Sequence, residues 1–405
     1  MARYAARLWS LVRSQKTTPT AWLPTAFRVS AMSVFSTIKI GNEKYPALTG
    51  VRAVGAIAVF FDHFPVWADS RITLNVLAFF FALSGFLIVR IYYEQAELKP
   101  EWLAKYFVNR FARIYPVYFL LLSIAVCIQH DFRPRVLLTN YTLTHALFHN
   151  MTFIIQPSWS LTVEECFYFL APLFMILARV YNFLVPFALG CLLLLAALLV
   201  SKLGSGFLGT PGFVLSTTFF GHFVEFFAGV YLALAVMKLE KRGPIYVRGN
   251  KYTMAGLAGV LLLVIAMFIV YRRTPLNVRA IIIINNFLIP FPIALLYWGL
   301  IRENTFLSRF LSSKVTGLLA RGSYSFYLLH MMIINYISIP LLASTNGYRP
   351  FYVVLTFIVT WIISILLFVF YEEPLNIFIR LRYRSKDVSS IRGPRAHDGD
   401  ERGLT

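Results

Sequence analysis

The stretch YPALTGVRAVGAIAVFFDHF, residues 45–64, decides the fold because it is an apolar segment that carries ionisable residues. Arg52 stands near its start and His63 near its end. Ionisable groups inside membrane-length apolar segments are energetically costly, so each is a candidate functional residue. A separation of eleven residues, at about 100° each, brings both side chains onto one helix face, roughly 16 Å apart along the axis. The stretch predicts a membrane helix with a cation near one surface and an imidazole deeper in.

The composition of the 405-residue chain indicates an integral membrane protein. It is 58% hydrophobic and 14% charged, with a mean hydropathy of +0.67, whereas soluble domains are about 45–50% apolar and about 25% charged. The net charge of +20 does not indicate nucleic acid as a partner, because the charges lie in short clusters between apolar runs, as the positive-inside rule predicts. Cys127, Cys166 and Cys191 lie in apolar runs without CxxC spacing, so the sequence predicts neither a disulfide framework nor a metal site.

Ten apolar segments have membrane-spanning length. We place them near 48–67, 74–93, 115–130, 160–179, 182–201, 220–238, 252–271, 280–300, 323–343 and 351–371. The predicted fold class is therefore all-α, a polytopic integral membrane protein with about ten transmembrane helices. Ten spans put both termini on one side, and the distribution of Lys and Arg makes that side cytoplasmic. Only eight of the 38 Lys and Arg residues fall on the opposite side: Arg71, Arg133, Arg135, Lys202, Arg272, Arg273, Arg279 and Arg349.

Three parts of the chain differ in composition. Residues 1–46 form a basic N-terminal arm without a signal-peptide core, which we expect in the cytoplasm, and either Met1 or Met32 is the true start. Residues 47–376 form the membrane domain, and residues 377–405 form a basic tail that we expect to be disordered.

The connections between segments also differ. We expect 94–114, 238–251 and 302–321 to be cytoplasmic loops and 131–159 to be a long loop on the opposite side. A loop longer than about 12–15 residues is usually functional or disordered. The aromatic and apolar content of 131–159 argues against disorder.

Two arginines occur three residues apart in RFARIYP, residues 110–116. On a helix, Arg110 and Arg113 share a face and form a fork suited to phosphate. Routine anchoring at the cytoplasmic membrane surface is the alternative.

The fourth segment opens with WSLTVEE, residues 159–165, and so carries adjacent carboxylates at its outer end. Acidic residues in a first helical turn stabilise the helix dipole, which is the structural explanation. Neighbouring residues point about 100° apart, so only one of Glu164 and Glu165 has to face the bundle interior. Glu164 shares its face with Tyr168, and we expect Glu164 and His63 to lie in the same outer leaflet.

Two further sets of polar residues share helix faces. His222 and Glu225 are three residues apart, and Ser323, Tyr327 and His330 line one face of the ninth segment. Structural and catalytic roles both remain open for them, because polar side chains also join helices within lipid.

Two other features indicate structural roles. Gly85 and Gly229 fit sites of close helix packing. The sequence YEEP at residues 371–374 is typical of a helix end.

Taken together, these motifs resemble the bacterial acyltransferase-3 family, multi-pass membrane O-acyltransferases of glycans and exopolysaccharides. The resemblance runs from about Tyr45 to about Asn376. Five motifs carry it in order: Arg52 and His63 as R-x10-H, residues 80–88 as FFxLSGFLI, 110–116 as RFxRIYP, 159–165 as WSLxxEE, and 323–330 as SYSxYLLH. Asp62 is a departure, since an aromatic or small residue is common before the histidine.

The resemblance implies a location and a pair of substrates. It places the protein in the bacterial inner membrane. It implies acetyl-CoA or succinyl-CoA as a cytoplasmic co-substrate, with no bound cofactor or metal, and a glycan or lipid-linked oligosaccharide as the acceptor on the opposite side. It also implies that Arg52 and His63 are essential and that Arg110 and Arg113 serve the donor.

Acyl transfer to an alcohol requires a base, and His63 is the candidate on the first helix. An acyl-histidine relay is the variant. Either Asp62 or Glu164 would orient the imidazole, and Glu164 fits better because Asp62 points about 100° away from the shared face.

The donor site is expected at the cytoplasmic mouth, where Arg52 would join Arg110 and Arg113 on the donor phosphates. The acyl arm would then extend roughly 16 Å along the first helix towards His63. Further candidate site residues are Trp159, Glu165, Tyr168, Tyr327 and His330.

Two other classes of protein have to be weighed. Buried Arg, His and Glu also suit a proton-coupled transporter or flippase of a glycan or lipid-linked substrate. The sequence shows no internal repeats of the kind that many transporters carry, which argues against this class. A structural or assembly subunit is the third option.

Overall fold

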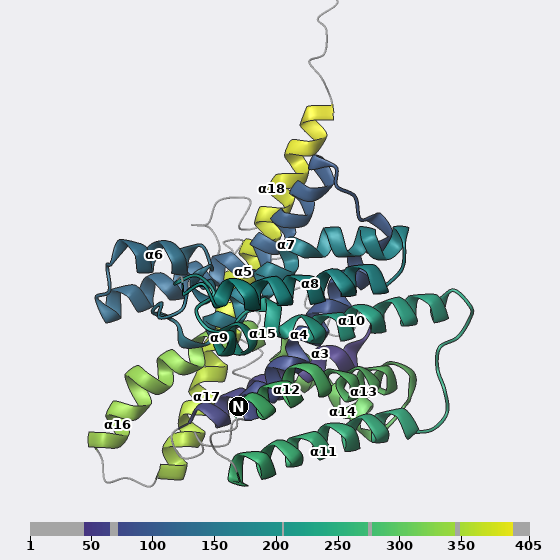
Figure 1. The fold of residues 1–405 in the computed structure, drawn as a ribbon. Coiled ribbons are helices and arrows are strands. Elements are labelled where there is room, and N and C mark those ends of the chain that lie inside the picture. The colour runs from purple at the N-terminus through teal and green to yellow at the C-terminus, as the bar shows by residue number, and fades with distance from the viewer. Residues whose placement is uncertain (1–43, 65–71, 205, 274–277, 345–348, 392–405) are drawn as a thin grey trace, which may run out of the picture.

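The structure, a computed structural model, describes residues 44–64, 72–204, 206–273, 278–344 and 349–391, and these form a helical bundle (Figure 1). The predicted all-α class is confirmed. The helices are α3 Pro46–His63, α4 Ile72–Tyr92, η1 Tyr93–Gln95, α5 Pro100–Gln129, α6 Pro134–Tyr141, η2 His145–Leu147, η3 Gln156–Ser158, α7 Trp159–Val180, α8 Leu184–Ser201, α9 Pro211–Thr217, α10 Phe219–Glu240, α11 Lys251–Arg273, α12 Val278–Ile283, η4 Ile284–Leu288, α13 Pro290–Arg302, α14 Phe306–Leu311, α15 Lys314–Ile333, η5 Ile334–Ser338, α16 Ile339–Ser344, α17 Arg349–Leu367, η6 Phe368–Glu372 and α18 Glu373–Ile391.

Within the described residues, nine helical stretches are long and apolar enough to cross a membrane. They coincide with the second to tenth predicted segments: Val76–Gln95, Pro100–Gln129, Gln156–Val180, Leu184–Ser201, Pro211–Glu240, Lys251–Arg273, Arg279–Arg302, Lys314–Leu342 and Pro350–Tyr383. The first predicted segment is the 18-residue helix α3, whose Arg52, Asp62 and His63 lower its hydropathy. Helix α3 packs inside the bundle against α4 and α15. The cytoplasmic position of the termini stays a prediction.

Close packing of α4 against α10 depends on two glycines. A Cβ added to Gly229 would collide with the backbone of Ala82, and one added to Gly85 would collide with the backbone of Phe226. Small residues allow helix backbones to approach closely within a membrane. The two helices therefore pack with their backbones in close contact.

The predicted cytoplasmic loop 94–114 is wrong over most of its length, because helix α5 begins at Pro100. A proline in the first turn is preorganised for a helix and lacks only an N–H that has no helical partner there. With 30 residues, α5 is about 45 Å long, which exceeds the roughly 30 Å of bilayer hydrocarbon. The predicted loop 302–321 likewise contains α14 and the start of α15.

The C-terminal prediction needs a similar correction. Helix α18 continues to Ile391 and packs against α5, projecting with it from the bundle (Figure 1), so residues 377–391 are not disordered. The predicted arm at 1–43, the choice between Met1 and Met32, and residues 392–405 lie outside the described residues.

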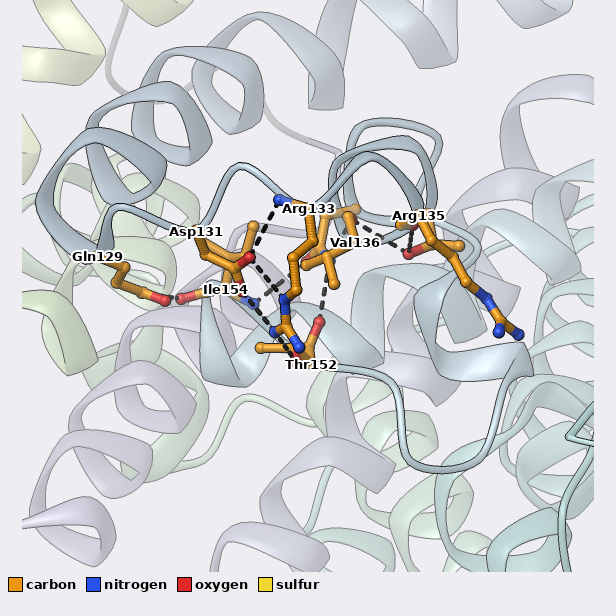
Figure 2. A network of polar contacts seen from close by, with 9 residues as sticks. Gln129, Asp131, Arg133, Arg135, Val136, Thr152 and Ile154 are labelled. Atoms are coloured by element: carbon orange, nitrogen blue, oxygen red, sulfur yellow. Dashed lines mark hydrogen bonds and ion pairs between the residues drawn. The ribbon is translucent and has the colours of Figure 1, made fainter.

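The segment 131–159 is folded into α6 and two short 3-10 turns. Figure 2 shows the polar network that holds it: the Arg133 guanidinium contacts the Asp131 carboxylate at 2.6 Å and donates to the Thr152 hydroxyl at 2.9 Å. Helix α6 lies at the end of the bundle away from the α10–α11 connection (Figure 1). The 131–159 segment and the 238–251 connection, which we predicted on opposite sides of the membrane, thus lie at opposite ends of the bundle (Figure 1).

Candidate active site

Two histidines from distant parts of the chain meet at the end of α3. His330 Nε2 lies 3.4 Å from His63 Nδ1, and their ring centroids are 5.2 Å apart. His330 is fully buried, while His63 is half-buried. A fully buried imidazole beside a more accessible one has the arrangement of an orienting group and a reacting group.

The hydrogen-bond partners assign the tautomers of both rings. His330 Nδ1 lies 2.6 Å from the Tyr327 carbonyl oxygen, which only accepts, so Nδ1 carries the hydrogen and Nε2 the lone pair. His63 Nδ1 in turn donates to the Val59 carbonyl at 2.9 Å and faces the Nε2 lone pair of His330. In this tautomer the lone pair of His63 is on Nε2, the atom required of a base.

The predicted contact between Glu164 and His63 is replaced by another. The Glu164 carboxylate accepts from Ser84 Oγ at 2.6 Å, and Ser84 Oγ accepts from the Tyr168 hydroxyl at 3.3 Å. Among the described residues, His330 occupies the place beside His63 that we had predicted for Glu164. The reason is rotational: the inner face of α7 points towards α4.

A small cavity of about 50 Å³ lies inside the bundle between α3, α4, α7 and α15. Arg52 and Glu164 line it together with Ser160 and Tyr327. Arg52 therefore lines a cavity between helices, and its predicted contact with the donor phosphates stays a prediction. The Tyr327 hydroxyl donates to the Pro157 carbonyl at 3.0 Å, which fixes the start of α7 against α15.

One face of α15 extends from Arg113, past this cavity, to His63. Tyr324, Tyr327 and His330 recur every three residues, and the first two line the cavity. The Arg113 guanidinium lies 5.9 Å from the Tyr324 ring centroid, while His330 contacts His63. A row of aromatic and polar side chains thus runs from Arg113 to the histidine pair.

The predicted fork of Arg110 and Arg113 is divided between two environments. Arg113 forms a 2.7 Å ion pair with the buried Glu372. Arg110 lies between the rings of Tyr92 and Tyr168, at 5.5 and 5.7 Å, and its buried Nε has no hydrogen-bond partner among the described residues. Arg110 is therefore the better candidate for binding an external anion.

Sequence analysis missed Glu372, which we had taken as part of a helix end. Its side chain is 1% exposed, and its second carboxylate oxygen accepts from Ser325 Oγ at 2.7 Å. It lies in the π-helical segment η6, and such segments are frequent at functional sites. The available signal was a carboxylate within an apolar segment of membrane length.

Two further candidates, Trp159 and Glu165, lie in the first turns of α7. Glu165 has a buried carboxylate oxygen without a hydrogen-bond partner among the described residues. The Trp159 ring packs 5.8 Å from that of His222, and His222 Nδ1 lies 3.0 Å from the fully buried Glu225. Across the described part of the chain, no three His, Cys, Asp or Glu side chains are grouped closely enough to hold a metal ion.

Comparison with known proteins places this arrangement in a family. The model of an acyltransferase domain matches residues 45–367. The chain is 26% identical to the peptidoglycan O-acetyltransferase OatA of Listeria monocytogenes serovar 1/2a (strain ATCC BAA-679 / EGD-e), over 84% of this chain and 57% of that protein. It is 28% identical to the acyltransferase MdmB of Streptomyces mycarofaciens, over 72% of this chain and 80% of that protein.

The match to the Listeria protein thus spans little more than half of that protein's length. No solved structure matches the chain. The family model covers all five sequence motifs, from the first arginine of R-x10-H to the last histidine of SYSxYLLH. The chain therefore belongs to the acyltransferase-3 family.

Proposed function

We propose that the protein is a membrane O-acyltransferase of the bacterial inner membrane. It would transfer an acetyl or succinyl group from cytoplasmic acyl-CoA to a hydroxyl of a cell-surface or secreted glycan, or of a lipid-linked oligosaccharide. The observation that carries the proposal is the contact of His63 with His330, which leaves His63 Nε2 free as a base. Family membership and a relative named as an O-acetyltransferase support it.

In the proposed reaction, His63 Nε2 removes the proton of the acceptor hydroxyl as its oxygen attacks the thioester carbonyl. Collapse of the tetrahedral intermediate expels the thiolate of CoA, which takes the proton back from His63. The His63 Nδ1–H stays directed at the Val59 carbonyl and at His330 Nε2. His330 thus holds the ring in one tautomer and orientation, the task of the third residue in a catalytic triad.

The proposed binding site for the acyl donor includes Arg110 and Arg52. The Arg110 guanidinium, with its unpaired Nε, would bind a phosphate of the donor. Arg52 would contact the acyl arm where it passes the interior cavity. The small volume of this cavity favours a short acyl group such as acetyl.

The proposal can be tested with the full-length protein in liposomes, supplied with acetyl-CoA carrying a labelled acetyl group and with bacterial glycan. Label is expected on the glycan with the wild type and not with His63→Ala. Equal labelling by both proteins would overturn the base assignment. Label that stays on His63 when the glycan is omitted would instead identify the acyl-histidine relay.

The transport alternative predicts a different response. If the protein is a proton-coupled transporter, an uncoupler that collapses the proton gradient would stop its activity, even with donor and acceptor supplied on their own sides of the membrane. An acyltransferase that needs no ion gradient would continue.

A further inference from the structure

A polar pocket of about 260 Å³ opens between the end of α5, the stretch before α7 and the end of α15. One wall is Gln129, the last residue of α5, and a second is the stretch from Phe153 to Gln156. The third wall comes from α15 and η5: Met331, Met332, Asn335 and Tyr336. The pocket therefore lies at the end of the bundle formed by the 131–159 segment.

One lining residue connects the pocket to the surroundings of the proposed base, because Met331 packs in one apolar cluster with Phe60 and Phe64, which lie close to His63 in the chain. Met331 directly follows His330, whose ring contacts His63. Asn335 and Tyr336 belong to the π-helical segment η5, Ile334–Ser338. A π-helical turn changes the direction of the side chains that follow it and is frequent at functional sites.

Hydrogen bonds hold the walls in place. The Gln129 side-chain amide donates to the Ile154 carbonyl at 2.7 Å, as Figure 2 shows, and the Asn335 amide donates to Gln156 Oε1 at 3.4 Å. The Arg133 guanidinium, drawn in the same view, joins Asp131 to Thr152. The pocket is thus preformed, which lowers the entropic cost of binding.

The lining points to one class of ligand. Its polar side chains are three amides and one phenol, and none of the residues that line it is ionised. Amides both donate and accept hydrogen bonds, which suits the hydroxyl groups of a sugar. The volume is a little below the roughly 300–1,000 Å³ of pockets for drug-sized ligands, so it suits a single sugar ring.

We propose that this pocket is the acceptor subsite and that it binds an uncharged sugar unit of the glycan, whose hydroxyl then reaches His63. Asn335, Gln156 and Gln129 provide its hydrogen bonds, and Tyr336 provides an aromatic side chain. This inference rests on the proposed function, because it assigns the acceptor of that reaction.

Kinetics of the full-length protein in liposomes test the subsite. The probes are the methyl glycosides of a neutral glucose disaccharide and of the same disaccharide with one glucuronic acid ring. Asn335→Ala and Gln156→Ala should each raise the KM for the neutral acceptor about tenfold, as loss of a hydrogen bond does. The KM for acetyl-CoA should not change. The matched control is Gln95→Ala, which removes an exposed amide in η1, outside this pocket.

Three kinetic results would overturn the subsite while leaving the proposed function intact: an unchanged acceptor KM in both variants, a donor KM that rises equally, or a wild type that prefers the glucuronic acid acceptor. Loss of transfer in the wild type itself would count against the proposed function.

A second measurement does not depend on turnover. The Asn335→Cys variant, with Cys127, Cys166 and Cys191 replaced by serine, is treated with a membrane-impermeant thiol reagent. The neutral disaccharide should slow the modification at least fivefold, and the glucuronic acid analogue should not. Equal rates with and without the neutral disaccharide would overturn the subsite even if transfer is observed.

Discussion

His330 Nε2 lies 3.4 Å from His63 Nδ1, although the two residues are 267 positions apart in the chain. The contact joins the end of α3 to the last turn of α15, and each ring is also fixed by a backbone carbonyl. Because Nδ1 of His63 is engaged, its Nε2 is the atom left for chemistry. The predictions below test this pair and the structure that supports it.

His63→Ala should lower kcat by about 10²–10⁴-fold, the usual contribution of a general base. Membrane insertion and abundance should not change, because His63 is only half-buried at a helix end. The measurement is acyl transfer per inserted protein. His130→Asn is the matched control, since His130 is exposed and has a left-handed backbone that asparagine tolerates.

His330 should act as a positioning residue. His330→Ala should lower kcat about tenfold to a hundredfold with little change in KM, because His63 loses the acceptor that orients it. His330→Gln should recover part of the rate, since its side-chain oxygen can accept from His63 Nδ1. The two variants should also differ in the pH profile of kcat. A purely structural role for His330 would leave that profile unchanged in both.

Arg113 and Arg110 should behave differently when replaced. Arg113→Ala leaves the buried Glu372 without its cation and should destabilise the protein by about 1–3 kcal/mol, less than for a fully buried pair because Arg113 is 23% exposed. Thermal inactivation in membranes measures this cost, and adding Glu372→Gln should reduce it. Arg110→Ala should instead raise the KM for acyl-CoA at unchanged stability. If both arginine variants only lose abundance, both residues are membrane anchors.

Acid should loosen the 131–159 segment through His145. Burial lowers the pKa of His145 to about 4, and its Nδ1 has no hydrogen-bond partner among the described residues. In the opened segment His145 takes up a proton below about pH 6.5, whereas in the folded segment it does not. The free energy needed to open the segment is therefore greatest above pH 6.5 and falls by about 3 kcal/mol towards pH 4.

Limited proteolysis of this segment between pH 7.5 and 4.5 measures that change. His145→Gln keeps a donor for Ser158 Oγ, the partner that His145 Nε2 contacts at 3.0 Å, and should abolish the pH dependence. Cleavage that accelerates equally in the variant would contradict the assignment.

Gly229→Ala should destabilise the bundle, because its Cβ would meet the backbone of Ala82, which cannot move aside as a flexible side chain does. A cost of about 1–3 kcal/mol is typical of overpacking. Gly317→Ala is the control, since a Cβ there meets open space. Thermal inactivation of the two variants in membranes gives the comparison.

Much of the fold follows from local patterns. Nine predicted segments coincide with helices of spanning length, and the remaining predicted segment corresponds to α3. The errors fall where polar sequence is helical: α5 begins at Pro100 and α18 continues to Ile391 because each packs against the other. Hydropathy detects lipid contact, and it does not detect helices that continue beyond the membrane.

The sequence by itself determined the class of the protein, its number of apolar segments and the residues worth testing, because hydropathy and helix periodicity are local properties. It also put Tyr327 and His330 on one face. Only the tertiary structure decided the partners: His330 for His63, Ser84 for Glu164 and Glu372 for Arg113. The physical reason is that a partner depends on the rotation of each helix about its axis, which is set by close packing between helices far apart in the chain.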